Sequence, residues 1–138
     1  MRVLLDNDVV LDFVLEREPF FADAEMIFQY LDDGDIECYV SAITPINVFY
    51  TTRKLKDKDI ALQAVKDLLV AIEVCRTDKT VLQTAFTLNF GDYEDAVQCA
   101  GALAENLDAI VTRNTKDYKN SFVKVYSPAE FVQLLQNT

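Results

Sequence analysis

The chain has 138 residues, of which 51% are hydrophobic and 26% are charged, a composition typical of one globular domain and not of a disordered segment. It has 13 Lys and Arg against 23 Asp and Glu, and the net charge of −10 argues against a basic nucleic-acid-binding groove. The absence of histidine excludes Ser-His-Asp and Cys-His catalysis, and three glycines are too few for a Walker-type phosphate loop. Phosphate chemistry here would need a positive charge from outside the protein.

The hydrophobic pattern predicts strands that alternate with helices along the chain. In the first part we expect strands near 3–5, 36–40 and 72–75, and helices near 9–14, 24–31, 45–50 and 60–69. Gly34 is expected to end the second helix. Thr44 is expected to cap the third helix, with Pro45 at its first position and with Ile46, Phe49 and Tyr50 facing inward.

The second part of the chain continues the alternation. Asp78 and Asp92 are expected to cap helices, the second of which runs to about Leu107. Strands are expected at 109–111 and 122–126, and Ser127–Glu130 has the pattern of a capping box that starts the last helix. We therefore predict an α/β fold, a three-layer sandwich in which helices flank a central, mostly parallel sheet, as one domain over residues 1–138.

The three cysteines, Cys38, Cys75 and Cys99, are far apart and surrounded by apolar residues. This pattern favours buried, reduced thiols over disulfides or metal ligands. The first apolar run ends at Asp6, too early for a signal peptide or a membrane span. We expect a cytoplasmic protein that is not in a membrane.

Acidic and amide side chains follow the strands that are expected near the centre of the sheet. Asp6 ends the first strand, Asn114 and Asp117 follow the strand at 109–111, and Asp92 and Asp95 begin a helix. Ligands of open α/β sheets bind beyond the carboxyl ends of the strands, so these groups are expected to converge there. Carboxylates that converge repel one another, and Mg²⁺, which takes oxygen ligands, would relieve this repulsion.

Each of these residues also has a purely structural interpretation. Asp6 and Asp92 are suitable helix caps, Asp95 would be stabilised by the helix dipole, and Asn114 with Asp117 could form a turn. No single acid is therefore strong evidence for a site. The prediction rests on their convergence.

Three segments in this order resemble the motifs of PIN domains. Leu4–Asp12 is similar to the opening motif, a hydrophobic strand followed by Asp-x-Asn/Asp-Val, and Glu94–Ala100 resembles the central Asp-Ala helix. Ile110–Tyr118 is similar to the last motif, a strand running into Thr-Arg-Asn/Asp-x-x-Asp-Phe. In size the chain resembles the toxin-type, VapC-like branch, the ribonucleases of bacterial toxin–antitoxin pairs.

The resemblance implies an endoribonuclease that depends on Mg²⁺ or Mn²⁺ and cleaves single-stranded RNA. Asp6, Asp95 and Asp117 would be the catalytic, metal-binding acids, and Asn114 would be a supporting ligand. Arg113 and Lys116 lie beside these acids in the sequence, either as contacts for RNA phosphates or as exposed charges without a role. Further partners implied by the family are a cognate antitoxin and a second copy in a homodimer.

One position departs from the family pattern. PIN domains usually carry a glutamate two residues after the proline position of the helix that follows the second strand, and this chain has Asn47 there. The amide removes one negative charge and motivates an alternative hypothesis, a catalytically impaired PIN-like protein that binds RNA or protein. A phospho-accepting receiver domain ranks lower, because the middle strand ends in Cys75-Arg76-Thr77 and lacks the expected aspartate.

The family also suggests where an antitoxin would bind. The apolar helices that start near Ala22 and Thr44 are expected to leave a hydrophobic groove for an antitoxin peptide, with an arginine of that peptide in the acidic cleft.

Overall fold

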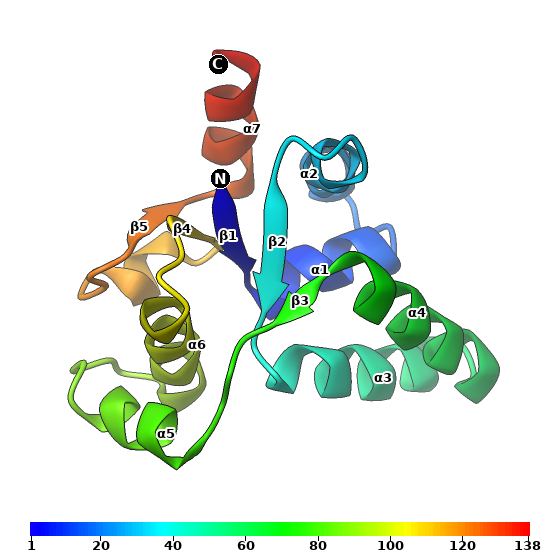
Figure 1. Cartoon of the computed structure of the whole chain (residues 1–138). Helices are drawn as coiled ribbons and strands as arrows, with labels where there is room; N and C mark the ends of the chain where they lie inside the picture. Colours follow the sequence, from blue (N-terminus) through cyan, green and yellow to red (C-terminus); the bar gives the residue numbers. More distant parts are fainter.

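The structure, a computed structural model, describes all residues from Met1 to Thr138. Its five strands form one sheet in the order β3-β2-β1-β4-β5, and every neighbouring pair of strands is parallel (Figure 1). The prediction of a mostly parallel sheet is thus confirmed, and no strand is antiparallel. The strands are β1 (Arg2–Leu5), β2 (Glu37–Val40), β3 (Glu73–Val74), β4 (Ala109–Val111) and β5 (Lys124–Tyr126).

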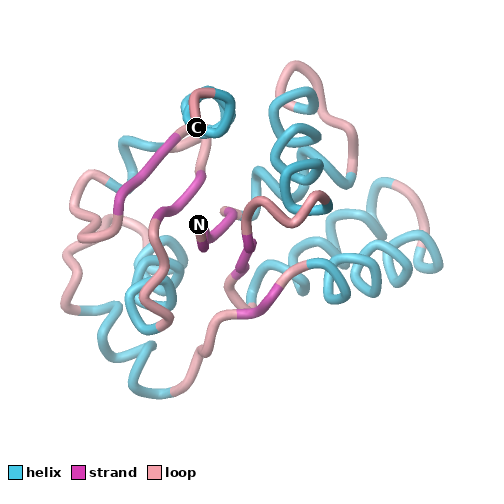
Figure 2. The backbone as a smooth tube through the Cα atoms, turned by 45° about the horizontal axis from the view of Figure 1, so that its top comes forward, coloured by secondary structure: helices cyan, strands magenta, loops and turns pink.

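Helices cover both faces of the sheet, which gives the expected three layers. Figure 2 shows α3 and α4 side by side on one flank and α5 and α6 on the opposite flank. The helices are α1 (Asn7–Val14), α2 (Phe21–Asp32), α3 (Ile43–Leu55), α4 (Lys58–Ala71), α5 (Lys79–Phe86), α6 (Tyr93–Ala104), α7 (Pro128–Gln136) and the short 3₁₀ helix η1 (Thr115–Tyr118).

Strand β1 separates two hydrophobic cores. Val3 and Leu5 belong to the core shared with α1, α2, α3, α4 and α7, whereas Leu4 belongs to the core shared with α5 and α6. Successive side chains of a strand point to opposite faces, so the unbroken apolar run of β1 fills both cores. This central strand, which is buried from Val3 to Leu5, fixes the position of Asp6, which follows it directly.

Most of the predicted helix boundaries are confirmed. The carboxylates of Asp78 and Asp92 accept hydrogen bonds from the third residue of their helices, and Ser127 and Glu130 form the predicted capping box. Gly34 lies just beyond α2 with a φ of +81°, a conformation that favours glycine.

The start of α3 was predicted incorrectly. Helix α3 begins at Ile43, and Thr44 is buried inside its first turn, where the Thr44 hydroxyl donates to Asn7 Oδ1 instead of capping the helix. Ile46 is 56% exposed and Tyr50 is 62% exposed, so these side chains do not face inward. The buried face of α3 carries Val48 instead.

One strand and one helix are shorter than predicted. Strand β5 begins at Lys124, and Phe122 is 79% exposed before it. Helix α6 ends at Ala104, and Leu107 is buried in the turn that leads to β4.

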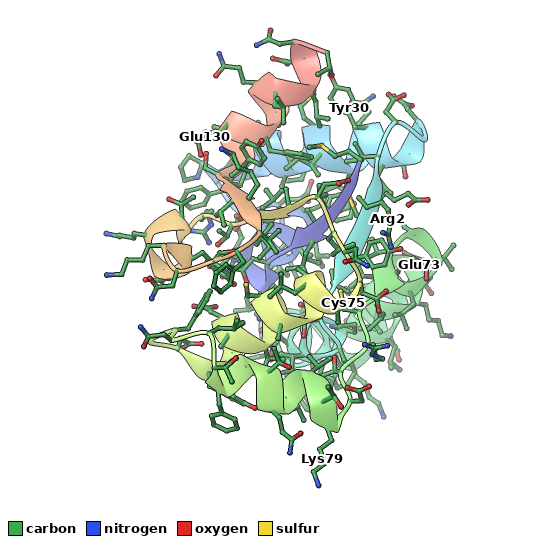
Figure 3. The ribbon with its side chains drawn as sticks, turned by 60° about the vertical axis from the view of Figure 1, so that its left-hand side comes forward. Arg2, Tyr30, Glu73, Cys75, Lys79 and Glu130 are labelled. Carbon is green, nitrogen blue, oxygen red and sulfur yellow. The ribbon has the colours of Figure 1, made fainter.

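The three cysteines are buried free thiols, as predicted. Burial raises the pKa of Cys75 to about 12. Figure 3 shows Cys75 beside α6, where an added Cβ at Gly101 would lie 3.3 Å from the Cys75 Cβ, so a small residue is needed at this contact. No helix is both long enough and apolar enough to cross a membrane.

Candidate functional site

Asp6 lies at the carboxyl edge of the sheet and is 5% exposed. It is the N-cap of α1: Oδ1 accepts from Asn7 N at 2.7 Å and from Gln98 Nε2 at 3.0 Å, and Oδ2 accepts from Thr112 Oγ1 at 2.7 Å. Burial raises the pKa of Asp6, and the hydrogen bonds from Gln98 and Thr112 partly offset the rise. All of the donors are neutral, so the protein orients this carboxylate without cancelling its charge.

Asp95 lies in the first turn of α6 with a second acid beside it. Its N–H donates to the N-cap carboxylate of Asp92 at 3.0 Å, and its Oδ1 accepts from Tyr118 Oη at 3.1 Å. Its pKa is raised to about 6, first by burial and then by the negative charges of Asp6, Asp92 and Asp117. The acids predicted to converge are therefore close enough to repel one another.

A cavity of about 300 Å³ opens between the start of α6 and η1. It contains three acids and two lysines, a polar lining that is largely without apolar side chains. The lining residues are Phe90, Gly91, Asp92, Asp95, Lys116, Asp117, Lys119 and Asn120.

A second polar group extends this site towards α3. Glu94 Oε1 accepts from Asn7 Nδ2 at 2.5 Å and from Asn47 Nδ2 at 3.4 Å. Sequence reasoning left Glu94 without a role, because nothing in the pattern indicated that residues 7, 47 and 94 meet.

Asn114 and Asp117 lie at the edge of the site. Asn114 Nδ2 donates to Asp8 Oδ2 at 3.2 Å, so the amide contacts a different acid from the ones it was predicted to support. Asp117 is exposed on η1 and lines the cavity together with Lys116.

Arg113 forms an ion pair with Asp12, a buried acid to which the sequence analysis gave no role. Its Nε lies 2.9 Å from Asp12 Oδ2, and its guanidinium stacks 3.8 Å from the ring centroid of Phe20. Arg17 Nε lies 2.9 Å from Asp12 Oδ1, and Asp12 is 1% exposed. The predicted phosphate contact of Arg113 would therefore compete with this internal ion pair.

The family follows from the sequence together with this fold. A model of the PIN domain matches residues 2–116. The chain belongs to the PIN domain family. Comparison with curated protein sequences finds no match.

Several solved structures have the fold of this PIN domain. A DNA-bound VapBC from Salmonella typhimurium is 16% identical with a TM-score of 0.71, covering 93% of this chain and 98% of that chain. A toxin–antitoxin complex from Klebsiella pneumoniae is 22% identical with a TM-score of 0.70, covering 91% and 97%. The Mycobacterium tuberculosis toxin VapC20, described as cleaving the sarcin-ricin loop, is 9% identical with a TM-score of 0.63, covering 78% and 86%.

PIN domain nucleases generally use divalent metals, and the donor chemistry of this PIN domain fits such an ion. No three Asp or Glu side chains lie close enough together to enclose a metal ion by themselves. Mg²⁺, however, commonly takes only one or two carboxylates and keeps several waters. The carboxylate of Asp6, which is oriented by its hydrogen bonds, is an oxygen donor of this kind. The carboxylate of Asp95, which is repelled by neighbouring acids, is another.

Proposed function

We propose that this PIN domain is a Mg²⁺- or Mn²⁺-dependent endoribonuclease that cleaves single-stranded RNA, and that it is the toxin of a toxin–antitoxin pair. The observation that carries the proposal is the position of Asp95 at the carboxyl edge of the sheet, where the negative charges of Asp6, Asp92 and Asp117 act on its carboxylate. No arginine or lysine forms an ion pair with any of them. Such uncompensated acids are costly to a fold unless they bind a cation.

In the proposed site, Asp6 and Asp95 hold the cation, with Asp117 and Asn114 as supporting groups that act through water. A bound Mg²⁺ or Mn²⁺ would supply Lewis-acid chemistry, polarising a phosphate oxygen and lowering the pKa of a bound water. Gln98 and Thr112 hold Asp6 in one orientation, and Tyr118 holds Asp95.

Lys116 and Lys119 line the same cavity and supply positive charge for RNA phosphates. We assign the phosphate contact to Lys116 in preference to Arg113, because the Arg113 guanidinium already pairs with Asp12. The remaining surface is acidic, so binding of RNA is expected to depend on the cation and on these few lysines.

An antitoxin partner is supported by the structural neighbours, four of which are described as VapBC or as a toxin–antitoxin complex. The sequence predicted a peptide groove between the helices that start near Ala22 and Thr44. Two apolar cavities each involve one of these helices. One, of about 550 Å³, lies between α1, α2 and α4, with Phe13, Phe21, Phe28 and Leu68 among its lining residues. The other, of about 480 Å³, lies between α3 and α4, with Ile46, Phe49, Tyr50 and Leu62 among its lining residues. A homodimer remains a prediction from the family.

Cleavage of a single-stranded RNA by the purified protein tests the proposal. We expect cleavage with Mg²⁺ or Mn²⁺, none in EDTA, and none from Asp6→Asn with either metal. Asparagine keeps the capping ability of Asp6 but removes its charge. The matched control Asp59→Asn, at an exposed acid in the first turn of α4, should cleave as the parent does. Binding of RNA without cleavage by the parent would reject the nuclease and support the binding module suggested by Asn47.

A further inference from the structure

The cavity between the start of α6 and η1 has one aromatic wall. Phe90 is half-buried and is the only apolar side chain that lines this cavity. Its ring meets the ring of Tyr118, which is 2% exposed, at an angle of 82° with the ring centroids 5.5 Å apart. Asn120 Nδ2 donates to the Asn89 carbonyl oxygen at 2.6 Å and so joins the loop before α6 to the segment after η1. The two walls are thus fixed relative to each other, and they offer an aromatic ring to a planar ligand.

The wall formed by η1 carries two lysines that have no acidic partner. Lys116 lies in η1, and Lys119 follows one turn later, with its N–H donating to the Lys116 carbonyl oxygen at 3.4 Å. Residues three apart in a 3₁₀ helix lie on the same side, and both lysines line the cavity. No lysine of the protein forms an ion pair with an acid. These two positive charges are therefore available to a phosphate group of a ligand.

The other free side-chain groups of the cavity are hydrogen-bond acceptors. The carboxylates of Asp92 and Asp95 each accept one hydrogen bond, whereas the exposed carboxylate of Asp117 accepts none within the protein. The amide nitrogen of Asn120 already donates to Asn89, which leaves the amide oxygen. A ligand that presents N–H donors towards Asp117 therefore suits this lining.

Guanine is the RNA base that matches these groups. Its N1–H and N2–H donors lie side by side on one edge and fit the two oxygens of a carboxylate. Adenine and cytosine present one amino group beside an unprotonated ring nitrogen. Uracil presents one N–H between two oxygens, which the carboxylates would repel. The cavity volume of about 300 Å³ is at the lower end of the range for small-molecule sites and suits one nucleotide.

We propose that this cavity binds one guanine nucleotide of a single-stranded RNA. Phe90 stacks on the base, and Asp117 accepts from its N1–H and N2–H groups. Lys116 and Lys119 hold the adjoining phosphate. The inference deepens the proposed function, from which it takes single-stranded RNA as the ligand, and no cation takes part in this binding.

Fluorescence anisotropy of the full chain in EDTA, with labelled oligouridylates, tests the inference. The oligonucleotides carry one central guanosine, one central inosine, which lacks the 2-amino group, or uridine throughout. We expect the parent to bind the guanosine oligonucleotide about tenfold more tightly than the other two, because one well-paired base edge gives discrimination of about this size. Asp117→Ala should bind the guanosine and inosine oligonucleotides equally, since the acceptor for the 2-amino group is gone.

Two further variants test the ring and the charge. Phe90→Leu should weaken binding of all three oligonucleotides by about tenfold, and Phe90→Tyr, which keeps a ring, should bind as the parent does. Its matched control Phe122→Leu, at a phenylalanine that is 79% exposed and outside the cavity, should have no effect. Lys119→Gln should weaken binding and lower its salt dependence, whereas Lys79→Gln, at the start of α5 (Figure 3), should not.

The outcomes separate this inference from the proposed function. Equal binding of the guanosine and inosine oligonucleotides by the parent, or a preference that persists in Asp117→Ala, overturns the inference. So does a Phe90→Leu variant that is folded by circular dichroism and binds as tightly as the parent, or a parent that binds none of the oligonucleotides. Cleavage of RNA by the parent with Mn²⁺, measured in parallel, keeps the proposed function in each of these cases.

Discussion

Two buried aspartates of helix α1, Asp6 at its cap and Asp12 within it, have opposite surroundings. Asp12 is 1% exposed and forms ion pairs with Arg17 and Arg113, so its charge is compensated within the protein. Asp6 is 5% exposed and accepts only from neutral donors, while Asp95 nearby is repelled by it. A compensated buried charge holds the fold together, whereas an uncompensated one is available to a ligand.

The largest effect is expected from removing the compensated charge. Asp12→Ala leaves the guanidinium groups of Arg17 and Arg113 without their buried partner, and should lower the free energy of unfolding by about 3 kcal/mol or more. Urea denaturation monitored by circular dichroism measures this loss. A loss below about 1 kcal/mol, the size of an ordinary point mutation, would show that Asp12 is no more structural than other residues.

A smaller loss is expected at the uncompensated site. Thr112→Val removes the hydroxyl that donates to Asp6 Oδ2 and should cost about 1–2 kcal/mol, because a buried acceptor loses one of its partners. The same denaturation experiment measures the cost, with Thr80→Val at an exposed position of α5 as the control. If Thr112→Val lowered the free energy of unfolding more than Asp12→Ala does, the hydrogen bond to Asp6 would stabilise the fold more than the ion pairs of Asp12, contrary to this expectation.

Removing an uncompensated charge should stabilise the protein. The pKa of Asp95 is raised to about 6 from 3.8, so the folded state disfavours its ionised form. Asp95→Asn should therefore raise the free energy of unfolding at pH 7 in EDTA, by about 1 kcal/mol once the partial exposure of the group is allowed for.

The pH dependence of this gain has a definite sign. The native state binds the Asp95 proton more tightly than the unfolded state, so the parent regains stability relative to Asp95→Asn as the pH falls through about 6 towards 3.8. Thermal melting of both proteins across this range gives the difference at each pH. A difference that stays constant or grows on acidification would contradict the repulsion.

Patterns among neighbouring residues were sufficient to predict much of the fold. The apolar run of β1, the caps at Asp78 and Asp92 and the capping box at Ser127 are set by neighbouring residues, and the structure has all of them. The first turn of α3 could not be predicted in this way. Thr44 resembles a cap, yet its hydroxyl bonds to Asn7, a residue that only the folded sheet brings close.

Residues of the candidate site could be predicted from the sequence only where a recognisable motif contains them. Asp6 and Asp95 lie in recognisable motifs, and the charge of Asp6 contributes to the raised pKa of Asp95, while their role as metal ligands stays a prediction. The ion pair between Asp12 and Arg113 joins residues that are 101 positions apart, and the contact between Asn47 and Glu94 joins residues 47 positions apart. Neither pairing leaves a periodic or local signal, so the sequence offered Arg113 as a phosphate ligand and gave Glu94 no role.

Thermal melting of the parent at increasing Mn²⁺ concentration tests the central claim, that the uncompensated acids form a cation site. An ion that binds only the folded state raises its stability by mass action. We expect the melting temperature of the parent to rise steadily with Mn²⁺, and we expect Asp6→Asn and Asp95→Asn to lose most of this rise while Asp59→Asn keeps it. A parent whose melting temperature does not change with millimolar Mn²⁺, or variants that respond as strongly as the parent, would contradict the claim.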